Sequence, residues 1–87
     1  MPISLDKFRA KLVIRILYSV PAQDAGKYIE RMVLLLKRKN LATDTIKSLI
    51  EKIINQLESV RQVTTDTFKW QNIALVILAL TEIKQQL

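Results

Sequence analysis

The sequence predicts an all-α protein, a small up-and-down bundle of about four helices. Hydrophobic residues make up 49% of the 87 residues, with one Gly and two Pro, a composition that fits neither a disordered chain nor a turn-rich β protein. Apolar residues recur at steps of three and four along four segments, as on a helix with one buried face. The connections are short and contain no Pro, Gly or Ser linker. We therefore expect consecutive helices to run antiparallel within one domain spanning residues 1–87.

The first helix is expected between two clear signals. Ser4 can cap its start, and Pro21 follows closely behind its end. Between them lies an apolar stripe at helical spacing, which should face the core. The stripe consists of Leu5, Phe8, Leu12, Ile16 and Val20.

The second helix should cover roughly residues 24–39. Its last residues Lys37, Arg38 and Lys39 complement the negative end of a helix. Asn40 can adopt the left-handed conformation that stops the helix. The expected buried stripe consists of Tyr28, Ile29, Met32, Val33 and Leu36.

The third helix has the clearest period and should lie on the surface with one buried face. Its remaining positions are polar, so a single stripe is expected to face the core. The stripe alternates steps of four and three through Ile46, Ile50, Ile53, Leu57 and Val60, and Leu49 and Ile54 widen it.

The fourth helix should run from about Thr67 to the end of the chain. Leu75 and Leu78 lie opposite its main apolar stripe. A helix that is apolar on two sides must be buried on more than one side, by its own bundle or by a partner. The main stripe consists of Ile73, Val76, Leu80, Ile83 and Leu87.

Two similar segments precede the third and fourth helices. Residues 43–45 and 65–67 both read Thr-Asp-Thr. Their side chains can cap free N–H groups, and their carboxylates suit the positive end of a helix. We interpret this as a helix start used twice and not as a repeat protein.

The residue types present argue against catalysis. The chain has no His and no Cys, so the commonest general base, a leading nucleophile and the usual transition-metal ligands are absent. Its carboxylates are scattered, and capping, pairing and solvation account for them. The single Gly, Gly26, cannot form a phosphate-binding loop. We expect no enzyme, no catalytic residue, no metal site and no cofactor.

No segment is suited to a membrane span or an export signal. The longest uninterrupted apolar stretch, residues 73–80, has eight residues, far fewer than the roughly 20 that a spanning helix needs. Arg15 interrupts the apolar run near the N-terminus, and no small-residue cleavage site follows. Because there is also no Cys for a disulfide, we expect an intracellular, cytoplasmic protein.

The positive charge is concentrated in the first part of the chain. The net charge is +6. Residues 1–40 hold nine Lys and Arg against three acidic residues, whereas residues 41–87 hold five of each sign. The first two helices therefore carry the whole excess, and a one-sided field of this kind attracts polyanions.

The excess charge forms a basic stripe on each of the first two helices. Steps of 100° per residue place Ile14 and Tyr18 on the basic face of the first helix, and Leu34 between the basic residues of the second. We predict contact with nucleic-acid backbone, with Tyr18 packing on sugar or base. The alternative is that the long basic side chains only solvate a small bundle. The predicted nucleic-acid-binding residues are Lys7, Lys11, Arg15, Tyr18, Lys27, Arg31, Lys37, Arg38 and Lys39.

Several apolar residues are candidates for contact with a protein partner. Phe68 and Trp70 open the last helix, where they either pack in the core or form an aromatic hot spot. Leu75 and Leu78 favour association of the chain, with itself or with another protein. The predicted partner-binding residues are Ile14, Leu34, Phe68, Trp70, Leu75 and Leu78.

In size, charge and helical content the whole chain resembles the small basic subunit that accompanies the B-family DNA polymerase in the replicative holoenzyme of some archaea. The resemblance includes no diagnostic motif, so no residue is assigned a role from it. It implies binding to a DNA polymerase and support of synthesis without an active site in this chain. Together with the basic stripes, it leads us to expect a non-catalytic accessory subunit of a DNA-handling complex, with a protein partner and nucleic acid as ligands.

Three other functions remain open. A protein-binding adaptor or homo-oligomeric bundle would use the positive helices to meet an acidic partner. A transcription regulator would need a helix-turn-helix, but the second helix lacks a recognisable recognition pattern. Binding of the first helix to a membrane surface would remove its apolar face from the core of a small domain, so we expect no membrane association.

Overall fold

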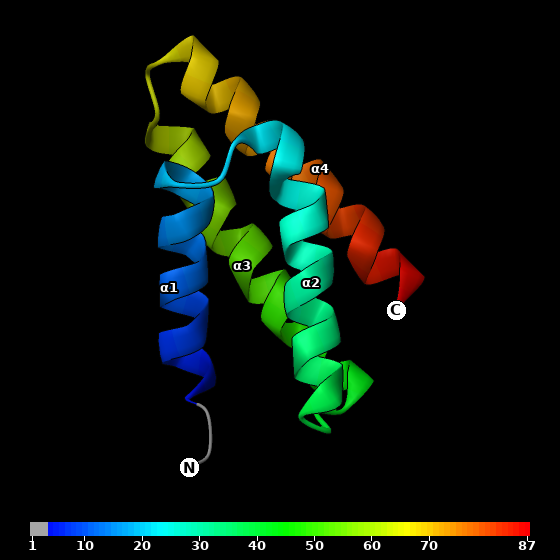
Figure 1. Cartoon of the computed structure of the whole chain (residues 1–87). Coiled ribbons are helices and arrows are strands. Elements are labelled where there is room, and N and C mark those ends of the chain that lie inside the picture. Colours follow the sequence, from blue (N-terminus) through cyan, green and yellow to red (C-terminus); the bar gives the residue numbers. More distant parts are fainter. Residues whose placement is uncertain (1–3) are drawn as a thin grey trace.

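Figure 1 shows the computed structural model, which describes residues 4–87. Four α-helices follow one another along the chain: α1 (Leu5–Tyr18), α2 (Ala25–Arg38), α3 (Thr43–Val63) and α4 (Thr67–Gln86). A short 3-10 turn, η1 (Ala22–Asp24), leads into α2. No strand occurs within residues 4–87. The predicted all-α fold class is therefore confirmed.

The first helix starts at the predicted cap. The backbone N–H of Lys7 donates to the Ser4 hydroxyl over 3.4 Å, and Asp6 adds a carboxylate in the first turn. At the other end the N–H groups of Ser19 and Val20 both donate to the carbonyl of Arg15. These bonds satisfy a carbonyl that would otherwise lack a partner where Pro21 prevents the helix from continuing.

Asn40 stops the second helix, as predicted. Asn40 has a φ of 62°, the left-handed conformation. Its N–H donates to the carbonyl of Lys37, and the N–H of Leu41 donates to the carbonyl of Leu36. This pair of bonds defines a Schellman motif, in which Leu41 also packs against the core.

The two Thr-Asp-Thr segments are used differently. The Asp66 carboxylate caps α4 and accepts from the N–H groups of Phe68, over 2.9 Å, and Lys69, over 3.2 Å. At α3 the cap position falls on Ala42, which has no capping side chain, and Asp44 lies within the first turn. The expectation of a common helix start is therefore wrong for the capping residue, because α3 begins one residue before Asp44, although Asp44 still places a carboxylate at the positive end of the helix.

The chain reverses at each connection, but sequence neighbours do not all pack together. In Figure 1, α3 lies behind the space between α1 and α2, and α4 crosses obliquely behind α2. The most extensive contact joins α3 to α4; α2 packs mainly on α4, and α1 packs mainly on α3. The first two helices therefore do not form a closely packed hairpin.

The core is one apolar cluster to which all four helices contribute. No polar or charged residue is buried among residues 4–87. Most predicted stripe residues are buried in the cluster. Eight are only partly buried: Leu5, Phe8, Val20, Tyr28, Met32, Ile54, Val60 and Leu87. The largest fully buried side chains are Ile29, Ile46, Ile53, Leu57 and Leu80.

The fourth helix is buried on one side only. Ile73, Val76 and Leu80 are buried, whereas Leu75 and Leu78 on the opposite side are 55% and 57% exposed. Of the two alternatives, burial of the second side by the bundle itself is therefore excluded, and burial by a partner stays a prediction. The other three helices are all on the core side of α4 and leave its outer face free.

Truncating a core residue should destabilise the fold strongly. We expect Leu57→Ala to lower the free energy of unfolding by about 2–5 kcal/mol, because it removes packed atoms and leaves a cavity. Leu78→Ala, on the exposed face of the neighbouring helix, should change it by less than about 0.5 kcal/mol. Urea unfolding followed by circular dichroism measures both values. Equal losses would contradict the assignment of these two side chains to core and surface.

The unequal helix starts give a second stability prediction. Asp66→Ala removes the acceptor for two backbone N–H groups and should cost about 1 kcal/mol. Asp44→Ala removes only a favourable charge near the start of α3 and should cost less, about 0.3–0.5 kcal/mol at low salt. The same unfolding assay compares the two variants. A larger loss for Asp44→Ala would contradict the assignment, because it would show that Asp44 stabilises the start of α3 more than Asp66 stabilises the start of α4.

Candidate nucleic-acid interface

The basic stripe of α1 lies fully in solvent. Lys7, Lys11 and Arg15 are all exposed. They follow one another at intervals of four residues, or about 6 Å along the helix axis. The three ion pairs within residues 4–87 are Arg9 with Asp6, Arg61 with Glu58 and Lys84 with Glu51. None involves the α1 stripe, so its charges are available to a ligand.

The second helix carries a similar stripe. Lys27, Arg31 and Arg38 are exposed and form no ion pair with another residue of the described chain. A Cβ added at Gly26 would lie 3.9 Å from the Cβ of Ala79, which identifies the flank of α2 that faces α4. The helical period places Lys37 on that same flank. Lys37 is thus exposed but turned toward α4, away from the main stripe.

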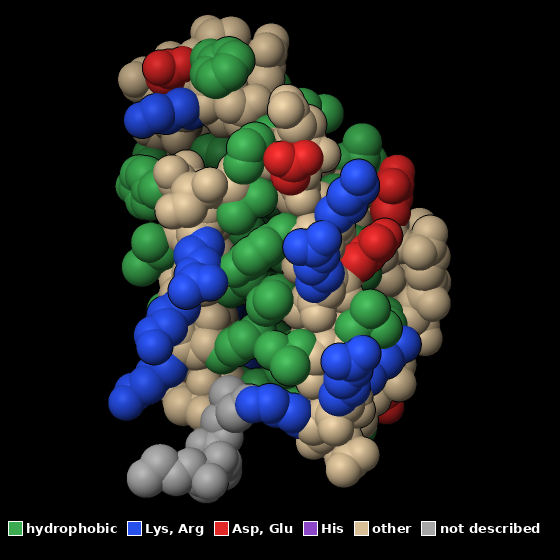
Figure 2. Space-filling model, in the orientation of Figure 1, with side chains coloured by type: hydrophobic (Ala, Val, Ile, Leu, Met, Phe, Trp, Pro, Cys, Tyr) green, Lys and Arg blue, Asp and Glu red, His purple; other side chains and the backbone are tan. Residues whose placement is uncertain are grey.

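Figure 2 shows how the two stripes are arranged. Lys and Arg side chains form one row over α1 and another over α2, and a band of hydrophobic side chains runs between the rows. The band is open because α1 and α2 pack on α3 and α4 and not on each other. The result is an apolar strip with a basic rim on each side.

The helical period identifies the side chains of this strip. On α2 the flank opposite Gly26 carries Tyr28, Met32 and Leu35, which are all partly exposed. On α1 one flank borders a separate open hollow of about 320 Å³ against α3. The other flank, which faces α2, carries Phe8. We call Phe8, Tyr28, Met32 and Leu35, together with Leu12 at the base, the α1–α2 groove.

Several predicted residues lie outside the groove. Tyr18 is 79% exposed and belongs to the face of the α1 stripe, as predicted. Ile14 and Leu34 are exposed on the outer sides of the two stripes, where the groove does not reach. Sequence reasoning assigned Phe8 and Tyr28 to the core, and both are partly buried and pack against it. It did not predict that part of each side chain stays exposed beside the basic stripes. Their positions at the edge of each apolar stripe, next to the basic residues, were the available signal.

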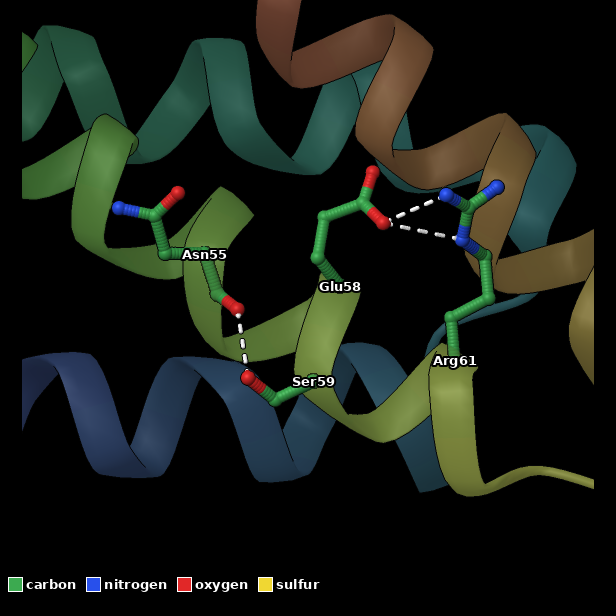
Figure 3. A network of polar contacts seen from close by, with 4 residues as sticks. All are labelled: Asn55, Glu58, Ser59 and Arg61. Atoms are coloured by element: carbon green, nitrogen blue, oxygen red, sulfur yellow. Dashed lines mark hydrogen bonds and ion pairs between the residues drawn. The ribbon is translucent and has the colours of Figure 1, made fainter.

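At the α3–α4 end, one arginine is held in a local polar network. Figure 3 shows the Arg61 guanidinium donating two hydrogen bonds to the same oxygen of Glu58, over 3.1 and 2.5 Å. Its guanidinium carbon also lies 5.0 Å from the centre of the Trp70 ring, a cation–π contact that links the end of α3 to the start of α4. In the same network the Ser59 hydroxyl donates to the Asn55 carbonyl over 3.1 Å. These contacts serve the fold and are separate from the α1–α2 groove.

The predicted partner-binding residues do not form one surface. Phe68, Leu75 and Leu78 are exposed on one face of α4, whereas the helical period turns Trp70 away from them toward Arg61. Ile14 and Leu34 lie on other helices. The outer face of α4 is therefore the most extended apolar surface among the predicted partner-binding residues.

A second, partly open hollow lies near the end of α1. A cavity of about 240 Å³ is bordered by the end of α1, by η1, by the end of α3 and by the first half of α4. Its lining is mainly aliphatic and includes Tyr18, with Thr64, Lys69 and Asn72 as further polar members. Within residues 4–87, no group of three acidic side chains is placed to hold a metal ion, and no helix has the length and apolar character of a membrane span.

Comparison of this chain with protein-family models, with curated proteins and with solved structures gave no match in any of the three. A function must therefore be argued from the surface itself. Its distinctive feature is the pair of basic stripes on either side of the α1–α2 groove.

Proposed function

We propose that this protein is a non-catalytic accessory subunit of a DNA-handling complex and that it binds nucleic-acid backbone through α1 and α2. The observation that carries the proposal is a set of cations on these two helices that have no ion-pair partner within residues 4–87. Acidic side chains do occur near the α2 row (Figure 2), but residues 1–40 hold only three acids against nine Lys and Arg, so a positive excess remains. The set consists of Lys7, Lys11, Arg15, Lys27, Arg31, Lys37, Arg38 and Lys39.

The physical basis of such binding is the release of counterions. Each phosphate that a Lys or Arg neutralises frees condensed cations, so affinity falls steeply as salt is added. The stripes present long, flexible charges on helix surfaces, which suit the backbone and carry no pattern for reading bases. Binding of this kind is independent of sequence.

The proposal also includes a protein partner. The outer face of α4, with Phe68, Leu75 and Leu78, is apolar and uncovered. Uncovered apolar patches of this kind commonly mark protein contacts. The resemblance to the small subunit of an archaeal polymerase holoenzyme supports a DNA polymerase as that partner. In this arrangement α4 holds the enzyme, and the basic helices hold its substrate.

A second candidate function is an adaptor for an acidic protein. The observation that favours it is the apolar α1–α2 groove between two basic rims (Figure 2). An amphipathic helix with an acidic outer face would complement such a groove. Binding to acidic protein segments together with indifference to nucleic acid would select this function.

Removing charge from the stripes should weaken nucleic-acid binding. We expect Lys11→Gln/Arg31→Gln to reduce the slope of log K against log salt by roughly 2, about one for each lost phosphate contact. The matched control is Lys52→Gln/Lys69→Gln, which removes the same charge from α3 and α4 and should leave the slope nearly unchanged. Fluorescence anisotropy with a labelled oligonucleotide over a salt series measures both. Equal losses would show that net charge, and not the two stripes, determines binding.

Removing the apolar outer face of α4 should abolish binding of the protein partner without unfolding the chain. We expect tagged wild-type protein, isolated from its native cells and treated with nuclease, to retain a replication or repair protein identifiable by mass spectrometry. Leu75→Ser/Leu78→Ser should lose that protein and keep its melting temperature within a few degrees, because both side chains are exposed. If nuclease strips every bound protein from the wild type, association runs through nucleic acid and the α4 part of the proposal fails.

A further inference from the structure

We propose that the α1–α2 groove binds single-stranded nucleic acid, with bases against its apolar walls and phosphates on its two basic rims. This inference rests on the proposed function and specifies the form of nucleic acid that the same face takes. It also assigns a role to aromatic residues that backbone binding alone does not use.

The first support is the shape of the face. Because α1 packs mainly on α3 and α2 packs mainly on α4, the two basic helices stay apart and the apolar strip between them remains open. Apolar surface that stays in contact with water is costly, at about 25 cal/mol per Å². A ligand that carries charge along its edges and apolar rings between them would cover this strip and contact both rims.

The second support is the placement of aromatic rings. Three of the five aromatic residues belong to α1 and α2: Phe8, Tyr18 and Tyr28. The helical period places Phe8 and Tyr28, which are partly buried against the core, on the flanks of α1 and α2 that face each other. Tyr18 lies on the face of the α1 stripe with 79% of its surface exposed, and it also borders the separate hollow at the end of α1. Aromatic rings interleaved with cations are the usual means of holding unpaired bases, because every base has a face that can stack.

The third support is the spacing of the charges. Lys7, Lys11 and Arg15 advance by about 6 Å from one to the next, which suits successive phosphates of one strand, whether that strand is single or part of a duplex. A single strand can follow this row and turn its bases into the groove. A duplex keeps its bases stacked inside, so it would touch the rims only with phosphates and leave the apolar strip uncovered.

An acidic amphipathic helix is the competing occupant of the groove. It would satisfy the same charges, and its apolar face would fit Met32 and Leu35. It would gain nothing specific from Tyr18, which projects into solvent from the α1 rim. Substitution of Tyr18 should therefore weaken the binding of a single strand and leave the binding of an acidic helix unchanged. Binding of an acidic peptide is one outcome of the test.

The experiment compares a labelled oligothymidylate with a duplex of the same length by fluorescence anisotropy at one salt concentration. We expect wild-type protein to bind the single strand at least about tenfold more tightly. Tyr18→Ser/Tyr28→Leu should weaken single-strand binding by about tenfold or more, since each lost stacking contact is typically worth a factor of several or more. Duplex binding should change by less than about twofold. Leu at position 28 keeps an apolar side chain at the edge of the core, and thermal melting confirms that the variant is folded.

The outcomes separate this inference from the proposal beneath it. If single strand and duplex bind equally and the aromatic variant changes neither, the groove does not hold bases, although backbone binding by the stripes stands. If neither nucleic acid binds more tightly to wild type than to Lys11→Gln/Arg31→Gln, both proposals fail. If an acidic amphipathic peptide binds and displaces the oligothymidylate without dependence on Tyr18, the groove is a protein-docking site and the single-strand inference is overturned.

Discussion

The long contact between α3 and α4 is the interaction on which the rest of the structure depends. These two helices pair more extensively than any other two, and each then supports one of the basic helices, α1 on α3 and α2 on α4. The core that forms between them is entirely apolar within residues 4–87. Its stability therefore comes from the hydrophobic effect and close packing and not from buried ion pairs. The separation of α1 from α2, and hence the open groove, follows from this arrangement.

Charge is distributed in a way that the fold alone does not require. The second half of the chain has equal numbers of acidic and basic residues, and two of its ion pairs, Arg61 with Glu58 and Lys84 with Glu51, lie within that half. The first half has an excess of cations on two helices that face the same direction (Figure 2). Such cations repel one another and destabilise the compact state. A polyanion that binds only the folded protein would relieve the repulsion and raise its apparent stability. The cost to the free chain is thus consistent with a surface selected for binding.

The sequence predicts the elements well and their arrangement less well. Apolar period, the Ser4 and Asp66 caps and the left-handed Asn40 are local signals, and the structure contains all of them. The period shows which face of a helix is apolar, but it does not show which helix covers that face. Tyr28 and Phe8 do pack against the core, as their place in the apolar stripes predicts, but they are only partly buried because α1 and α2 do not pack closely on each other. The basic residues of the candidate site could be predicted, because a charged side chain outside an apolar stripe is expected to be exposed. The apolar strip between α1 and α2 could not, because it depends on how the helices pack together.

The two candidate surfaces differ in what drives binding to them. The groove face would gain most of its affinity from counterion release, which weakens as salt rises. The outer face of α4 presents Leu75 and Leu78 with Glu82 as the charged residue between them on that face, so a partner there would be held mainly by apolar contact, which salt weakens little. The two surfaces lie on different helices and share no residue. Under the proposed function, a protein bound to α4 would stay attached while nucleic acid exchanges on α1 and α2, because neither surface includes a residue of the other.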